Sequence, residues 1–368
     1  MITMLVATAG LMCGILAQPA DASPNAKPPA SPTHEAKDPT PPAPPAPKDG
    51  AAVVKQLVAE AALLTPLVES GVAREFLAAA GDLPVVESRT VYRKPGSAIT
   101  AATWETLSEE ERATYRPRVC TPEFYYYTGY GSPLVYSRVV DLMGLHGVPS
   151  LDGKRVLDFG YGTIGHLRLL SQRGAEVHGV EIEPLFEALY SNETDVRVGT
   201  GPQTVFLHTG QWPADQELTK HIASHGRDGT FDVVTSKNTL KRGYVHPEPP
   251  AGKTVDERML VKLGVDDETF LAAVHAALKP GGLFIIYNIC PAQSPSDDPT
   301  KPYLPMADGR SPFTREQYAA AGFEVITFDG DDQTWVLGCW KALEYDEGKP
   351  KEEAAKETYA HYTVVRKK

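Results

Sequence analysis

Cysteine is scarce in this chain of 368 residues, which contains only four. Cys13 lies in an apolar stretch at the start, while Cys120, Cys290 and Cys339 are far apart and form no C-x-x-C pair. Thiols at this spacing predict neither a disulfide framework nor a zinc site. One disulfide or three buried, unreactive thiols both fit the pattern, and no metal site is expected.

Positive charge is also in short supply. The chain has 36 Lys and Arg residues against 47 Asp and Glu residues, which gives a net charge of −11. This balance disfavours a nucleic acid as partner, because phosphates require a basic surface. With 42% hydrophobic residues, the composition is that of a globular protein with room for one large domain and an accessory region.

The N-terminus lacks an apolar run long enough to span a bilayer comfortably, since the run from Met4 to Ala17 is short. Ala20-Asp21-Ala22 fits a cleavage site, so residues 1–22 are predicted to be a signal peptide or membrane anchor. The protein would then be exported (periplasmic, secreted or membrane-anchored) and would meet the membrane only through this segment. No Lys or Arg precedes the apolar run, so a misplaced start and a cytoplasmic protein remain open.

Three further regions follow the leader. Residues 23–50 are rich in Pro and Ala and predict a disordered linker. Residues 51–132 show helical spacing of apolar residues, a capping-box pair at Ser108 and Glu111, and an aromatic cluster at 124–130. This region is expected to be a mainly helical cap.

Residues 133–368 alternate between apolar strands and amphipathic helices. Such repeated βα units predict an α/β fold with a mostly parallel sheet and helices on both faces. Seven strands are expected, near residues 155–160, 175–183, 196–210, 231–238, 283–290, 323–329 and 359–367.

The turn after the first of these strands carries the chemistry. The sequence VLDFGYGTIG at residues 156–165 has the spacing G-x-G-x-x-G, which by itself is a weak sign of a nucleotide-like ligand. Glu181 closes the next strand about 20 residues on, where a carboxylate binds ribose hydroxyls. Asp158, two residues before the first glycine, would repel a pyrophosphate but suits a ligand with a sulfonium and an ammonium group.

With these motifs, the sequence resembles the class I S-adenosylmethionine-dependent methyltransferases. VEIEP, FDVVTSKNTL, LKPGGLFII and the C-terminal YAHYTVVRKK extend the resemblance over about residues 133–368. It implies a Rossmann-like sheet of seven strands whose last strand is antiparallel and lies between the fifth and sixth. The implied activity is methyl transfer from S-adenosylmethionine to an unidentified small-molecule or side-chain acceptor by in-line displacement, in a pocket at the carboxyl ends of the central strands.

The resemblance also implies which residues bind the cofactor. Glu181 would bind its ribose, while Gln211 and Trp212 would contact its adenine, although the family more often places an acid there. An ordinary core position for Trp212 is the alternative. The methionine part would be lined by Asp158, Gly160, Tyr161 and Gly162.

Candidate catalytic residues come from two loops. Lys237 and His246 lie after the fourth strand, in a loop whose basic residues would suit an anionic small-molecule substrate. Tyr130 ends the aromatic cluster and could cover the substrate or cofactor. Each feature also has a structural interpretation. The loop could be a solvated charged loop, His246 a structural histidine, and the aromatic cluster a packed core.

Two other functions remain open. An aminopropyltransferase-like enzyme would share the fold, but TSKNTL lacks the expected gate aspartate. A non-catalytic cofactor-binding or scaffold protein is the alternative from another class, suggested by the leader because S-adenosylmethionine is made in the cytosol. A nicotinamide oxidoreductase is disfavoured by Asp158 and by the C-terminal hairpin.

Overall fold

The computed structural model describes residues 48–198, 204–224, 230–295 and 301–368. The predicted leader (1–22) and nearly all of the predicted linker (23–50) lie outside these residues. The first helix, α1, begins at Gly50, and the Asp49 side chain caps it by accepting a hydrogen bond from the backbone N–H of Ala52.

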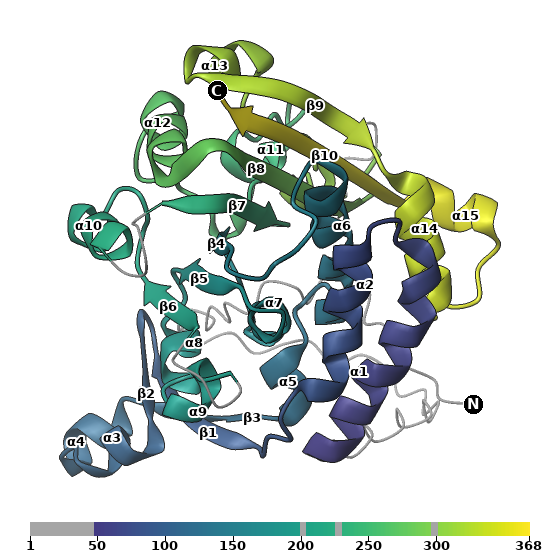
Figure 1. Ribbon diagram of the computed structural model, residues 1–368. Helices are drawn as coiled ribbons and strands as arrows, with labels where there is room; N and C mark the ends of the chain where they lie inside the picture. The colour runs from purple at the N-terminus through teal and green to yellow at the C-terminus, as the bar shows by residue number, and fades with distance from the viewer. Residues whose placement is uncertain (1–47, 199–203, 225–229, 296–300) are drawn as a thin grey trace, which may run out of the picture.

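A seven-stranded sheet forms the centre of the molecule (Figure 1), with strand order β6-β5-β4-β7-β8-β10-β9. Neighbouring strands are parallel except β10, which pairs antiparallel with both β8 and β9. The predicted fold class and the insertion of an antiparallel last strand are therefore confirmed. The strands are β4 (Arg155–Phe159), β5 (Glu176–Glu181), β6 (Val205–Thr209), β7 (Phe231–Lys237), β8 (Leu278–Pro291), β9 (Phe323–Asp331) and β10 (Thr358–Lys367).

Helices cover both faces of this sheet (Figure 1), because its central strands are apolar on both sides. In β4, Val156 belongs to one core cluster and Leu157 to the other, and both are fully buried. The helices after α1 (Gly50–Leu64) are α2 (Gly71–Ala78), α3 (Ala101–Glu105), α4 (Glu109–Ala113), α5 (Pro122–Tyr126), α6 (Ser137–Leu145), α7 (Gly165–Gln172), α8 (Pro184–Leu189), α9 (Glu193–Val196), α10 (Gln216–Ser224), α11 (Arg242–Val245), α12 (Asp267–Ala277), α13 (Arg315–Ala320), α14 (Gln333–Ala342) and α15 (Lys351–Glu357). Short 3₁₀ turns η1 to η5 lie at Thr65–Leu67, Ala79–Asp82, Pro133–Tyr136, Glu257–Met259 and Pro305–Ala307.

The N-terminal region contains an element that the sequence analysis did not predict. Beside its helices, β1 (Arg89–Lys94) pairs antiparallel with both β2 (Ser97–Thr100) and β3 (Arg116–Cys120). Val91 is the only buried residue of β1, so the strand gives almost no alternating apolar signal. The run Gly50–Leu67 has the length and composition of a membrane span, and its buried side chains belong to the core of the structure.

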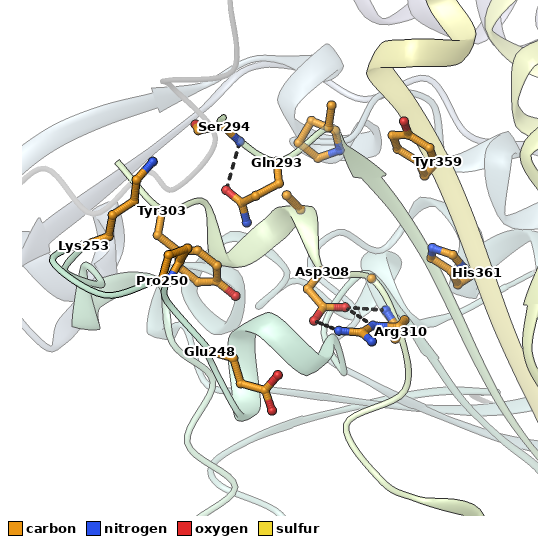
Figure 2. A pocket seen from close by; sticks show the side chains of 14 residues that line it. Glu248, Pro250, Lys253, Gln293, Ser294, Tyr303, Asp308, Arg310, Tyr359 and His361 are labelled. Carbon is orange, nitrogen blue, oxygen red and sulfur yellow. Dashed lines mark hydrogen bonds and ion pairs between the residues drawn. The ribbon is translucent and has the colours of Figure 1, made fainter. Parts of the chain in front are cut away.

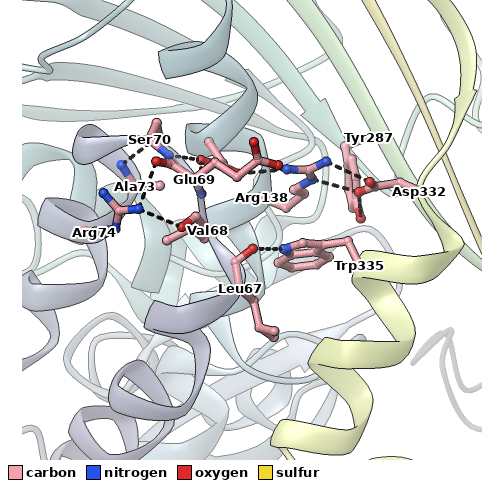
Figure 3. Close-up of polar contacts among 11 residues, drawn as sticks. Leu67, Val68, Glu69, Ser70, Ala73, Arg74, Arg138, Tyr287, Asp332 and Trp335 are labelled. Carbon is pink, nitrogen blue, oxygen red and sulfur yellow. Dashed lines mark hydrogen bonds and ion pairs between the residues drawn. The ribbon is translucent and has the colours of Figure 1, made fainter.

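A buried arginine joins the N-terminal region to the sheet (Figure 3). The Arg138 guanidinium donates two hydrogen bonds to Asp332 at 2.8 and 2.9 Å and one to Asp141 at 2.8 Å. Asp141 also accepts from the backbone N–H groups of Glu69 and Ser70, which directly precede α2. Each charge of this buried group therefore has an opposite partner, as its low exposure requires.

Candidate functional site

The glycine turn lies between β4 and α7, at the carboxyl edge of the sheet. Gly160 and Gly162 have φ angles of +77° and +62°, which side chains rarely adopt. A Cβ atom on Gly160 would lie 2.3 Å from the Thr239 hydroxyl oxygen, in the loop after β7. A Cβ atom on Gly162 would meet nothing within 4 Å, so the space above the second glycine is open.

Glu181, the last residue of β5, is tied to this turn. Its carboxylate accepts a hydrogen bond from the Gly162 N–H at 3.0 Å and two more from the N–H groups of Ile182 and Glu183. Desolvation raises the pKa of Glu181, while these three N–H groups act in the opposite direction. The carboxylate is thus held in one place, where the ends of β4 and β5 meet.

Sequence reasoning missed Ile182, which follows this carboxylate. Its apolar side chain is 63% exposed, an unusual position for an isoleucine. The sequence did contain a signal for this residue. An apolar residue directly after the acid that ends a strand lies beyond the sheet, where the core no longer covers it. The turn therefore presents an apolar surface beside a fixed carboxylate.

Asp158 is enclosed by protein groups and does not face an open space. Its side chain is fully buried and accepts hydrogen bonds from Tyr136 at 2.9 Å and Thr235 at 2.7 Å. The His166 imidazole lies 2.7 Å away and stacks on the Tyr136 ring. The sequence predicts that this carboxylate meets a cationic ligand directly, whereas in the structure its hydrogen bonds go to the protein.

Lys237 ends β7 near Asp158 and Cys339. Desolvation by the surrounding protein lowers the pKa of Lys237 to about 8, while the nearby Cys339 and Asp158 act in the opposite direction. No hydrogen bond joins its ammonium group to any residue that the structure describes. A substantial fraction of this amine is therefore neutral slightly above neutral pH.

Three other residues predicted to bind the cofactor have side chains that are buried or already hydrogen-bonded within the protein. Tyr161 is buried and lies against Gly179, because a Cβ atom there would be 2.7 Å from its ring. Trp212 is buried and packs on Phe159 and Phe270, as its core alternative requires. Gln211 donates a hydrogen bond to the Lys262 carbonyl at 2.6 Å.

Tyr130 differs from the other tyrosines of its cluster. Tyr125 and Tyr127 bury their rings and donate hydrogen bonds to Asp195 and Glu60, and Tyr126 is likewise buried in the core. The Tyr130 hydroxyl instead lies 2.8 Å from the Tyr244 hydroxyl, and its ring covers the Lys241 ammonium at 4.8 Å.

Lys241 itself is completely buried. It donates hydrogen bonds to the carbonyl groups of Ile289 at 2.6 Å and Met306 at 3.4 Å. Burial lowers the pKa of Lys241 to about 7. This lysine holds Tyr130 and the loop after β7 against the end of β8.

The basic loop after β7 does not form an open positive patch, because Lys241 is buried and both Arg242 and His246 lie against carboxylates. His246 lies 3.1 Å from both carboxylate oxygens of Asp267 at the start of α12. Gln317 of α13 donates to the same carboxylate, and Arg242 pairs with Glu248. His246 therefore belongs to a contact between α11, α12 and α13, and not to the group around Asp158.

Cysteines and metal ligands add no further site within the described residues. Cys120, Cys290 and Cys339 are buried and free, so the second of the two cysteine interpretations holds. Within the same residues, no group of three or more His, Cys, Asp or Glu side chains is placed to hold a metal ion.

Comparison with known proteins finds likeness in structure alone. No family model matches the chain, and no curated protein matches its sequence. A candidate sarcosine dimethylglycine methyltransferase from Galdieria sulphuraria is 12% identical, with a TM-score of 0.36, over 65% of this chain and 86% of its own. Phosphoethanolamine N-methyltransferase 2 of Haemonchus contortus is 15% identical, with a TM-score of 0.38, over 63% of this chain and 52% of its own.

A third solved structure is geranyl diphosphate C-methyltransferase from Streptomyces coelicolor, which is 13% identical over 64% of this chain and 80% of its own. Its TM-score is 0.37. At these identities and TM-scores, a function for this chain has to be argued from its own residues.

Proposed function

We propose that this protein transfers a methyl group from S-adenosylmethionine to a small-molecule or side-chain acceptor. One observation carries the proposal: the Glu181 carboxylate is fixed by the Gly162 N–H at the carboxyl edge of the sheet. The antiparallel β10 lies between β8 and β9 in that sheet, as the class I resemblance requires. In open α/β sheets, ligands bind at this edge, near the point where the strand order reverses.

The groups around the turn fit the adenosine part of the cofactor. Glu181 Oε1 accepts two backbone N–H groups, whereas Oε2 accepts only the Gly162 N–H and keeps a second lone pair for a ribose hydroxyl. The exposed Ile182 offers an apolar surface for the base, and the open space over Gly162 allows close approach. The side chains of Tyr161 and Trp212 are too buried to share this role.

Asp158 supports the proposal in a different way from that expected. Because His166 and Tyr136 already contact its carboxylate, it acts as a positioning residue beneath the turn. The preference for S-adenosylmethionine over a dinucleotide then depends on the strand order with its antiparallel seventh strand.

Lys237 is the best candidate base of the described residues near the turn. Bound S-adenosylmethionine supplies an electrophilic methyl group on a sulfonium centre. A positive charge near Lys237 lowers its pKa further, and the neutral amine can then take the proton from the acceptor atom that is methylated. Lys237→Met should remove this proton acceptor and leave cofactor binding in place.

Calorimetry on the full chain tests the cofactor. We expect S-adenosylmethionine to bind and NAD not to bind. Glu181→Gln should weaken S-adenosylmethionine binding by about 10-fold or more, since a hydrogen bond to a charged group contributes about 1.5–3 kcal/mol. Glu187→Gln, on the exposed side of α8, is the matched control. Binding of NAD without S-adenosylmethionine, or an unchanged Glu181→Gln variant, would contradict the proposal.

Amine labelling tests the role of Lys237. An acylating reagent modifies only the neutral amine, and peptide mass spectrometry measures how fast Lys237 is modified at each pH. The plot of this rate against pH should have its midpoint near pH 8. Saturating S-adenosylmethionine should move the midpoint lower, and the exposed Lys220 serves as internal reference. A midpoint at or above 10 would exclude Lys237 as the base.

A further inference from the structure

A cavity of about 560 Å³ lies beyond the carboxyl end of β8, apart from the residues of the glycine turn (Figure 2). Lys253 and Pro250, from the loop after β7, lie across it from Tyr359 and His361 of β10. Its volume is within the range of small-molecule sites.

Both carboxylates on the wall of this cavity already have an arginine partner. Asp308 accepts two hydrogen bonds from the Arg310 side chain, at 2.8 and 2.6 Å. Glu248 is paired with Arg242, which does not line the cavity. Neither acid therefore needs a cation from a ligand.

Three other groups on the wall, the side chains of Arg310, Lys253 and His361, can donate further hydrogen bonds. Asp308 fixes the Arg310 guanidinium through Nε and Nη2, so the Nη1 edge lies outside this contact. The Lys253 ammonium donates to one backbone carbonyl, at 2.7 Å, and can donate two more hydrogen bonds. The His361 imidazole forms no hydrogen bond with any residue that the structure describes.

The rest of the lining is largely apolar or aromatic. Pro250, Pro291, Tyr303 and Tyr359 contribute rings, and Figure 2 shows Tyr303 on one side and Tyr359 on the other. The tyrosine rings suit an aromatic body, and the proline rings add apolar surface for a compact hydrocarbon body.

We propose that this cavity binds a small organic anion, in which one carboxylate or phosphate group is attached to an aromatic or apolar body. Arg310, Lys253 and His361 would bind the anionic group, and the proline and tyrosine rings would pack against the body. The inference goes beyond the proposed function, because none of these residues belongs to the glycine turn.

Calorimetry with three probes on the full chain tests the inference. Benzoate joins a carboxylate to an aromatic ring and phenyl phosphate joins a phosphate to one, whereas benzamide has the ring without the charge. We expect both anions to bind at least 10-fold more tightly than benzamide, and the tighter of the two identifies the anionic group. Arg310→Met should weaken anion binding by about 10-fold or more, because a charge-assisted hydrogen bond is lost.

Further variants separate binding from folding. Lys253→Met should also weaken anion binding, whereas Lys220→Met on α10 should not. The Arg310 and Lys253 variants should keep the far-ultraviolet circular dichroism spectrum and the melting temperature of the unaltered protein, which shows that they are folded without reference to the proposed function. Equal binding of benzoate and benzamide, or unaltered anion binding by Arg310→Met, would overturn the inference.

Discussion

Replacing Lys241 by methionine should flatten the pH dependence of stability between pH 6 and pH 8. Burial lowers the pKa of this amine from 10.5 to about 7 in the folded protein. The unfolded chain keeps the proton up to about pH 10.5, so it binds more protons than the folded chain above pH 7. Stability due to this group therefore rises with pH from about 7 to 10.5.

The size of the effect follows from proton linkage. With pKa values of about 7 and 10.5, the free energy of unfolding gains about 1.4 kcal/mol between pH 6 and pH 8 from Lys241 alone. Loss of the hydrogen bonds to Ile289 and Met306 in Lys241→Met shifts stability at every pH and leaves this slope unaffected.

Urea unfolding at pH 6, 7 and 8, at constant ionic strength, measures the slope. The difference in free energy between the unaltered protein and Lys241→Met isolates the contribution of this lysine, because all other titrating groups are common to both. Lys220→Met, an exposed lysine on α10, is the matched control. If Lys241→Met keeps the slope of the unaltered protein, Lys241 is protonated in the folded state across this range and the reasoning fails.

Three other experiments test the packing. Gly160→Ala should lower the melting temperature clearly more than Gly162→Ala, because only the former places a Cβ atom 2.3 Å from a side-chain oxygen. For Gly162→Ala we expect the free energy of unfolding to fall by about 1 kcal/mol, from its positive φ alone. Arg138→Met should lower the free energy of unfolding in urea by about 3–5 kcal/mol, since it leaves the buried carboxylates of Asp141 and Asp332 without their positive partner. A double-mutant cycle of Tyr130→Phe and Tyr244→Phe should give a coupling of about 0.5–1.5 kcal/mol, and strict additivity would show that their hydroxyl contact adds no stability.

Sequence patterns predicted the seven-stranded sheet well, for a physical reason. Each central strand is a short apolar run closed by glycine or a polar turn, and a parallel sheet buried on both faces requires such runs. β1 was missed because its neighbours cover only Val91, and a strand with one buried residue has no periodicity to detect.

The candidate site was predictable only in part. The spacing of Gly160, Gly162 and Glu181 indicated the turn and its carboxylate, since these contacts follow from strand positions. The partners of Asp158 were not predictable, because His166 comes from α7 and Tyr136 from a turn 22 residues earlier. The cavity beyond β8 joins two loops and the strand β10, which are far apart in the sequence, and no local pattern encodes such a meeting.

The position of β10 has a consequence for how this protein folds. β10 is the last strand in the sequence, yet it lies between β8 and β9, so β9 has no partner in the sheet until β10 arrives. During synthesis, β8 therefore keeps one unpaired edge, and β9 keeps two, until the ten residues of β10 are available. Because such late, non-local pairing slows folding and leaves edges open to other chains, aggregation should be greatest in the interval before β10 inserts.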